Sequence, residues 1–271
     1  MDSLPPEIFS HILIYMDMDS ILNVSTTCSF YKYICSDNND YIWKILTHNI
    51  LNGLVNHKTI QDFNEYNRTS FCNWHELCTY ICKLAINPWR LLYHSCEGHV
   101  DIVNYIYKSL ICGKYDEYDE EDPSRTEYGI PDDKKIEYSV VYGDDYDEYK
   151  HDMNKVMEKC LECSSRYGRL NLFKYIHRLH PTIFENQYIQ TIANASIYGH
   201  LNIILYCIEN VHSNNMIFDL CFMLAAHGGH IDILKYIPLD SISHNIKQQV
   251  LIKSTQAGQS DVIEYLQGRK V

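Results

Sequence analysis

The chain has 271 residues, 46% of them apolar and 21% charged, which is enough for one large or two smaller folded cores and excludes a disordered protein. Its formal net charge of −12 disfavours nucleic-acid binding. The sequence has no run of 18 apolar residues, so it indicates no membrane span. It also does not open with a basic stretch followed by an apolar run, so it indicates no secretory signal. The eleven cysteines, an odd number in a long chain, are best explained as reduced thiols, so we expect an intracellular protein.

The first predicted elements, between residues 4 and 46, are three or four short helices. Ile8, Ile12 and Met16 recur at a spacing of four, and the last helix is expected to end near Trp43. So small a segment cannot bury all of its apolar side chains by itself. It therefore needs a partner to pack on.

This stretch resembles the F-box, a small helical module whose pattern opens with Leu-Pro and Glu-Ile and ends with a tryptophan about forty residues in. The departures are Met16 where leucine is usual, Ile21 in place of a leucine, and a third helix with only Lys32 as a basic residue. The alternative is an ordinary helical cap on a helical protein. The matching positions are Leu4, Pro5, Glu7, Ile8, Asp17, Asp19, Leu22, Cys28, Tyr31 and Trp43.

Residues 45–86 are predicted to be helical in part, because FCNWHELCTYICKLAI places apolar residues three and four positions apart. This segment would join the N-terminal module to the rest of the chain. It would also cover the first face of a repeat array and so leave the F-box surface free for an external partner.

From Pro88 onward one nine-residue pattern recurs five times without gaps. Its glycine suits a left-handed residue that ends a helix, and the Asp or Asn three positions later suits a cap or the first turn of a second helix. Each repeat is therefore predicted to be a helix hairpin. The copies are GHVDIVNYI from Gly98, GRLNLFKYI from Gly168, GHLNIILYC from Gly199, GHIDILKYI from Gly229 and GQSDVIEYL from Gly258.

Other positions of the repeat are predicted to be buried. Apolar pairs and a tyrosine in each second helix would form an internal stripe, and a small residue three positions before each glycine would let neighbouring first helices approach closely. The pairs are Ile102/Val103, Leu172/Phe173, Ile203/Ile204, Ile233/Leu234 and Val262/Ile263; the tyrosines are Tyr105, Tyr175, Tyr206, Tyr236 and Tyr265; the small residues are Ser95, Ser165, Ser196, Ala226 and Thr255.

The repeats resemble ankyrin repeats, in which an antiparallel helix pair has a Gly-His-Leu-Asp-Ile-Val type start to its second helix. Two features depart from that family: the Thr-Pro-Leu-His opening is missing, and the last four glycines are 31, 30 and 29 residues apart instead of 33. The loop-based binding surface of the family is therefore not assumed. Divergent repeats behind an F-box are similar to those of giant DNA viruses and their amoebal hosts. The alternative is a non-repetitive helical bundle.

The interval from Gly98 to Gly168 is more than twice the others and indicates an insertion at about 113–153. Between Lys114 and Asp152 there are 15 acidic and 5 basic residues, so this segment carries −10 of the net charge. We interpret it as a solvated loop. The alternative is an acidic, tyrosine-rich arm that docks a basic partner or shields a groove.

No motif in the sequence predicts catalysis. Cys160 and Cys163 form a lone Cys-x-x-Cys, which without a second pair favours packing over zinc, so no metal site and no cofactor are predicted. His99, His200 and His230 each follow a repeat glycine, and a position shared by several copies predicts a structural hydrogen bond to backbone rather than catalysis. A zinc or redox enzyme would rest on the cysteine count alone.

The sequence thus predicts an all-α chain: an F-box module at 1–47, a helical linker or N-terminal cap at 48–87, and about five divergent ankyrin-like repeats forming a helix-hairpin solenoid at 88–271. By resemblance, it is the non-catalytic substrate receptor of a Skp-cullin-F-box ubiquitin ligase, acting in the cytoplasm or nucleus, of a host cell if the chain is viral. Its partners would be a Skp-family adaptor, through it a cullin scaffold, and an unknown target protein, with neither nucleic acid nor membrane. The alternative is an ankyrin scaffold or decoy that sequesters a host protein without ubiquitylation.

These resemblances imply two sets of binding residues. The F-box resemblance implies adaptor-binding positions, and the ends of the first helices of the repeats are predicted to lie near a concave, target-binding face. The adaptor-binding set is Leu4, Pro5, Ile8, Leu13, Leu22, Cys28, Tyr31 and Trp43, and the target-binding set is Arg166, Tyr198, His227 and Gln256.

Overall fold

The computed structural model describes residues 40–51, 56–82, 84, 86, 88–113, 152–210 and 215–268. These ranges contain thirteen α-helices and one 3-10 helix and no strand, so the all-α prediction is confirmed for them. Within the same ranges, no helix is both long and apolar enough to cross a membrane. The predicted helices before Asp40 and the acidic insertion lie outside the described residues.

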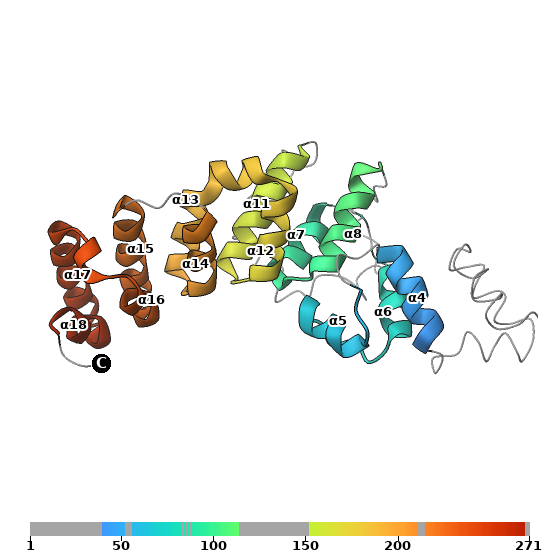
Figure 1. Ribbon diagram of the computed structural model, residues 1–271, viewed down its shortest axis with the longest axis horizontal. Coiled ribbons are helices and arrows are strands. Elements are labelled where there is room, and N and C mark those ends of the chain that lie inside the picture. Colours follow the sequence, from blue (N-terminus) through green and yellow to red (C-terminus); the bar gives the residue numbers. More distant parts are fainter. Residues whose placement is uncertain are drawn as a thin grey trace, which may run out of the picture. The chain divides into compact units, whose positions relative to one another are not determined.

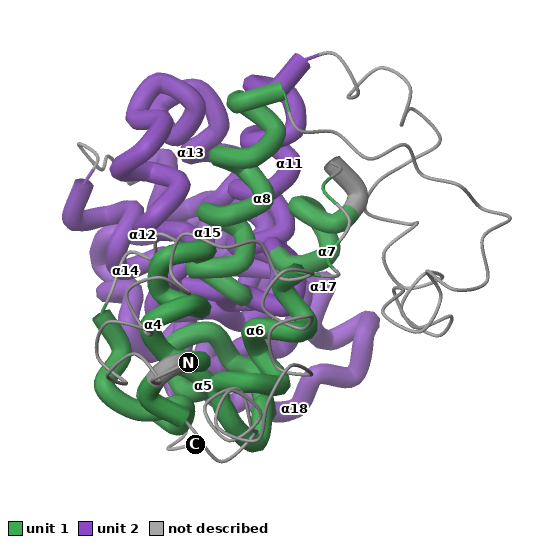
Figure 2. The backbone as a smooth tube through the Cα atoms, turned by 90° about the vertical axis from the view of Figure 1, so that its right-hand side faces the viewer, with its two compact units in different colours: residues 1–94, 99–140 green, residues 95–98, 141–271 purple. Residues whose placement is uncertain are grey.

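The chain divides into two compact units (Figure 2). The N-terminal unit comprises residues 1–94 and 99–140, and the C-terminal unit comprises residues 95–98 and 141–271. All three tryptophans of the chain fall in the N-terminal unit, so their fluorescence reports on that unit.

The N-terminal unit is built around α4, which packs against α6 and α8, while α5 packs against α8. The core includes Trp43, Phe63 and Trp74, and the rings of Phe63 and Trp74 meet edge to face with centroids 5.9 Å apart. The helix bounds in this part of the chain are α4 Asp40–Leu51, α5 Ile60–Asn67, α6 Trp74–Cys82, α7 Pro88–Glu97 and α8 Val100–Ile111.

The helix expected to end near Trp43 instead begins at Asp40 and continues to Leu51. Leu46, Thr47 and Leu51 are all buried, so its second half contributes to the core of the unit. The prediction stopped at Trp43 because it followed the end of the F-box pattern, whereas burial of these later side chains extends the helix.

The C-terminal unit is a series of helix hairpins, which succeed one another in Figure 1 from α11 to α18. Each first helix packs against its own second helix and against the first helix of the next hairpin. The repetitive hairpin organisation predicted from the glycine pattern is therefore present. The bounds are α11 Met153–Arg166, α12 Leu170–Leu179, α13 Pro181–Ile197, α14 Leu201–Asn210, α15 Asn215–Gly228, α16 Ile231–Tyr236, η2 Leu239–Ser241, α17 His244–Ala257 and α18 Ser260–Leu266.

Most predictions about the repeat positions are confirmed. The five repeat glycines all have φ between 69° and 87°, in the left-handed region. The apolar pairs are buried apart from Ile263, and four of the small residues before the glycines are buried, whereas Thr255 in the last described hairpin is exposed. Of the predicted tyrosine stripe, only Tyr175 is buried; Tyr105, Tyr206 and Tyr265 are half-buried, and Tyr236 is 48% exposed where the short helix α16 ends.

Of the two roles predicted for the Asp and Asn positions, a place in the first turn of the second helix is confirmed and the cap is not. The residue directly after the glycine, such as His99 or Arg169, already occupies the N-cap, so the Asp or Asn falls within the first helical turn. An acidic side chain still favours the helix there, because it faces the positive end of the helix dipole.

The residue after each of the last four repeat glycines instead links one hairpin to the hairpin before it. In the C-terminal unit this side chain donates a hydrogen bond to the carbonyl oxygen two residues before the preceding glycine. The backbone bond predicted for His200 and His230 is thus confirmed, with its acceptor on the preceding hairpin. This inter-repeat ladder consists of Arg169 Nε to the Cys96 oxygen at 2.6 Å, His200 Nε2 to Arg166 at 2.8 Å, His230 Nε2 to Ile197 at 2.7 Å and Gln259 Nε2 to His227 at 3.0 Å.

Loss of one ladder bond is expected to loosen a single junction. His200→Ala removes the donor to the Arg166 carbonyl and should lower the free energy of unfolding of the C-terminal unit by about 1–2 kcal/mol. His200→Gln should recover most of that loss, because Gln259 makes the equivalent bond at another junction. Urea unfolding followed by circular dichroism would measure both, and equal losses for the two variants would contradict a role for the bond.

Candidate functional site

Of the eight predicted adaptor-binding residues, only Trp43 lies within the described residues. Its side chain is 1% exposed, and its indole stacks at a tilt on the His75 ring with centroids 4.4 Å apart. A buried indole shapes a surface through packing and does not touch a partner directly. A large exposed side chain on this helix is Tyr41, 68% of which is accessible, and no motif in the sequence singles it out.

A buried polar network fastens α8 to the segment that precedes it in the N-terminal unit. Asp101 is fully buried, and its Oδ2 lies 2.7 Å from His57 Nε2 and 2.9 Å from Asn67 Nδ2. The backbone N–H of Asp101 donates to Asn67 Oδ1 at 2.7 Å. Three separate segments therefore meet at one carboxylate, and the network holds α5 and α8 together.

A second buried chain of polar groups runs through α6, α7 and α8. The Tyr80 hydroxyl lies 3.2 Å from His94 Nε2, and His94 Nδ1 lies 2.7 Å from His99 Nδ1, so one of these two ring nitrogens carries the shared proton. His99 therefore bonds a side chain, and the backbone bond predicted for it stays a prediction. Burial, followed by the nearby His99 and Arg90, holds the pKa of His94 well below its usual value.

The N-terminal unit should consequently lose stability in mild acid. His94 is neutral when folded and takes up a proton when unfolded, so its contribution is complete above an unfolded pKa of about 6.5 and is lost as the pH falls below it. Lowering the pH from about 7.0 to 5.5 should cost about 1 kcal/mol through this group. Urea titrations followed by tryptophan fluorescence should show a shallower pH dependence for His94→Gln than for the wild type. An unchanged slope would contradict the assignment.

The four predicted target-binding residues all lie at the ends of first helices. Arg166 and Tyr198 come together, with the guanidinium carbon 4.8 Å from the centre of the tyrosine ring. His227 and Gln256 are exposed at the ends of α15 and α17. That these positions bind a target stays a prediction.

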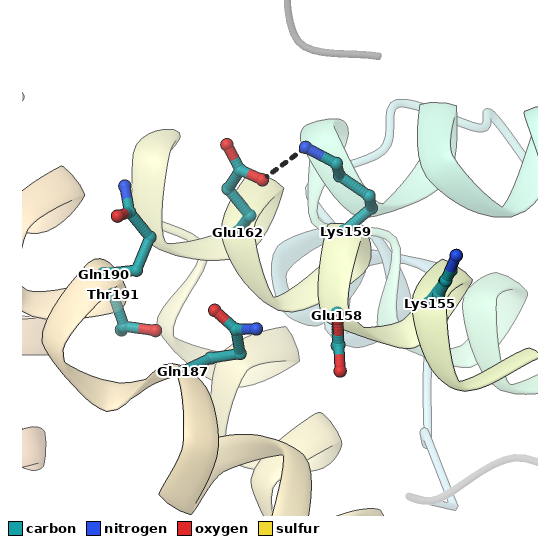
Figure 3. A pocket seen from close by; sticks show the side chains of 7 residues that line it. All are labelled: Lys155, Glu158, Lys159, Glu162, Gln187, Gln190 and Thr191. Carbon is teal, nitrogen blue, oxygen red and sulfur yellow. Dashed lines mark hydrogen bonds and ion pairs between the residues drawn. The ribbon is translucent and has the colours of Figure 1, made fainter. Parts of the chain in front are cut away.

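A polar groove of about 300 Å³ lies along α11 and α13 (Figure 3). Lys159 Nζ pairs with Glu162 Oε2 at 2.8 Å on its α11 wall. No sequence pattern indicates this site, because its polar residues occupy the ordinary exposed face of an amphipathic helix and only the packing of α11 against α13 brings them together. The lining residues are Lys155, Glu158, Lys159, Glu162, Gln187, Gln190 and Thr191.

The cysteines of the C-terminal unit are buried core residues. Cys160 and Cys163 are fully buried, and burial raises the pKa of the Cys160 thiol to about 12. A hydrogen bond with Cys96, together with burial, raises the pKa of Cys163 well above its usual value. Thiols in this state are poor nucleophiles. Among the described residues, no group of three histidine, cysteine or acidic side chains could hold a metal ion.

Comparison with known proteins identifies one region of the chain. Residues 1–48 match the family model described as F-box-like, over the stretch in which the sequence resembles an F-box. A search of curated proteins found no match, and a search of solved structures found none either. F-box domains generally bind Skp-type adaptors, and F-box proteins are typically non-catalytic. The chain therefore carries an F-box-like segment at residues 1–48, succeeded by a helical part with repeated hairpins.

Proposed function

We propose that this chain is the substrate receptor of a Skp-cullin-F-box ubiquitin ligase. Residues 1–48 would dock on a Skp-family adaptor, which links to a cullin scaffold, and the hairpin array would hold the protein to be ubiquitylated. The observation that carries the proposal is the F-box-like match over residues 1–48, with helix hairpins in the remainder of the chain.

The packing of α4 supports a mechanical role for the F-box-like segment. Residues 40–48 belong both to the matched segment and to α4, which packs against α6 and α8. Because Trp43 and Leu46 are buried in that contact, an adaptor bound to the F-box-like segment would be held firmly to the N-terminal unit. A receptor needs such a connection, since it acts by placing a bound target near the conjugating enzyme.

Such a receptor performs no bond-making itself. It holds target lysines close to the conjugating enzyme, so their encounter no longer depends on diffusion from bulk solution. For short connections the effective concentration of the lysines near the enzyme reaches the millimolar range. Within the described residues, the thiols with raised pKa and the buried histidines serve packing and hydrogen bonding, consistent with a binding role.

The repeats are proposed to be divergent ankyrin-like repeats. Three observations support this assignment: hairpins of two helices, a left-handed glycine between them, and first helices that pack side by side. The missing Thr-Pro-Leu-His opening and the shorter spacing remain departures from the family. A stacked array of this kind offers a continuous surface on which proteins bind.

Copurification with a Skp-family adaptor tests the proposal. The wild-type chain should retain the adaptor, and Leu4→Ala/Pro5→Ala should lose at least about 30-fold in affinity, because central residues of a standard interface each cost about 2 kcal/mol or more. Asp232→Ala, an exposed change in α16, is the control and should bind like the wild type.

Two outcomes would overturn the receptor role. If the wild-type chain does not bind the adaptor, the F-box-like segment has no docking function. If the adaptor binds but a reconstituted ligase with the chain ubiquitylates no protein that the chain retains from its native cell, a non-catalytic scaffold or decoy takes the place of the receptor.

A further inference from the structure

The groove along α11 and α13 is formed by two facing stripes of polar side chains. On each helix the lining residues recur every three or four positions, so they lie on one side of the helix. Figure 3 shows the α11 residues opposite Gln187, Gln190 and Thr191 of α13. The stripe on α13 continues one turn beyond Gln190 to Asn194, and both stripes lead to Arg166 and Tyr198.

Asn194 has an unused hydrogen-bond donor. Its side chain is 8% exposed, and its Oδ1 accepts a bond from Gln190 Nε2 at 3.3 Å. Its Nδ2 is buried and has no partner within the described part of the chain. A buried donor left without a partner costs about 1–3 kcal/mol. Because this nitrogen is closed off from solvent, a ligand in the groove meets Gln190 and not the Asn194 donor.

The chemistry of the lining selects among ligand classes. Two lysines and two glutamates balance in charge, so the groove does not favour a strongly acidic or basic ligand such as a nucleic acid. None of the seven lining side chains is an apolar residue, so the groove lacks the anchors that an amphipathic helix requires. The neutral lining side chains are Thr191 and two carboxamides, Gln187 and Gln190, each of which both donates and accepts hydrogen bonds. Peptide groups have the same pair of functions.

We propose that this groove binds an extended segment of the target polypeptide through its main chain. Gln187 and Gln190 pair with peptide N–H and C=O groups of that segment. The α11 wall of the groove, from Lys155 to Glu162, spans about 10 Å, which accommodates about three residues of extended chain. The inference rests on the proposed receptor function only in identifying the bound polypeptide as a target.

Binding of unstructured peptides to the full-length chain tests the groove directly. The probe is a phage-displayed library of random twelve-residue peptides, and the affinities of enriched peptides are then measured by fluorescence anisotropy. Gln187→Ala/Gln190→Ala should weaken binding at least about tenfold. The matched control is Gln248→Ala/Gln249→Ala on α17, where Gln249 bonds Asn245 at the same four-residue spacing at 3.2 Å, and it should bind like the wild type.

The mode of recognition is tested on the peptides themselves. Methylation of single backbone nitrogens should abolish binding at two or more positions, whereas alanine substitution of the peptide side chains should change affinity less than about threefold at most positions. The proposal is overturned if no peptide is enriched, if both double variants bind alike, or if side chains alone decide affinity. Retention of a neutral oligosaccharide by the groove in place of any peptide would also overturn it.

The groove test and the adaptor test fail separately. Gln187→Ala/Gln190→Ala should leave adaptor copurification unchanged, because those residues lie outside the F-box-like segment. Loss of peptide binding with intact adaptor binding therefore concerns the groove alone. Peptide binding without adaptor binding would refute the receptor role but support the proposal that the groove binds polypeptide.

Discussion

Replacing Asp101 with alanine is expected to lower the free energy of unfolding of the N-terminal unit by about 3–5 kcal/mol. The fully buried carboxylate is the common partner of His57 and Asn67, at 2.7 and 2.9 Å. Removing it takes this carboxylate oxygen away from the buried His57 ring and the Asn67 amide, and leaves a small cavity between α5 and α8. Urea unfolding followed by the fluorescence of Trp43 and Trp74, both in this unit, measures the change.

The repeat supplies a matched control for Asp101. Asp232 occupies the same position after its glycine, but its side chain is exposed on α16. Asp232→Ala should therefore change stability by less than about 0.5 kcal/mol. Similar losses for the two variants would mean that Asp101 acts through the helix dipole alone and that the buried network contributes little.

Gly199→Ala is expected to destabilise the C-terminal unit by about 2–4 kcal/mol. Gly199 has a φ of 82°, which costs an alanine about 1–2 kcal/mol. In addition, a Cβ at this position would lie 2.6 Å from Nδ1 of His230, whose ring is fixed by its bond to the Ile197 carbonyl. Either the ring moves and the bond breaks, or the junction opens. Hydrogen exchange of the amides in α13 to α16 should localise the loss to this junction.

Two comparisons separate the backbone from the steric effect. Gly258→Ala has a similar φ of 70° but no atom within 4 Å of the added Cβ, so it should cost only about 1–2 kcal/mol. In a His230→Ala background, the cost of Gly199→Ala should fall to about the same value. If Gly199→Ala is equally costly with and without the imidazole, close approach by His230 is not the cause.

The repeat pattern predicted the features that depend on local sequence. Gly199 and its counterparts were expected in the left-handed region, and pairs such as Ile203 and Ile204 were expected in the core, because a helix end and a helix face are encoded within a few residues. The F-box module at residues 1–47 was recognised on the same basis, as typed positions at fixed offsets, and the F-box-like match over residues 1–48 covers it.

Contacts between distant segments were not predictable in this way. Asp101 was expected to favour its own helix, yet it pairs with His57, which is 44 positions away and belongs to no repeat. The groove was missed because Gln187 and Lys155 look like ordinary solvated helix positions until α11 and α13 pack together. Periodicity shows which face of a helix is polar, but only tertiary packing shows which two polar faces meet.

The inter-repeat ladder makes the hairpins interchangeable. Each bond has a main-chain carbonyl as its acceptor, which every residue type supplies, so a hairpin can precede any other without a matching side chain. The donor is equally tolerant, since histidine, arginine and glutamine all reach the same oxygen. If a whole hairpin were duplicated or removed, with the break placed at a repeat glycine, the same hydrogen bond would therefore form at the new junction. Such an array can change its length, and with it the set of proteins it binds, without new side chains at the contacts between hairpins.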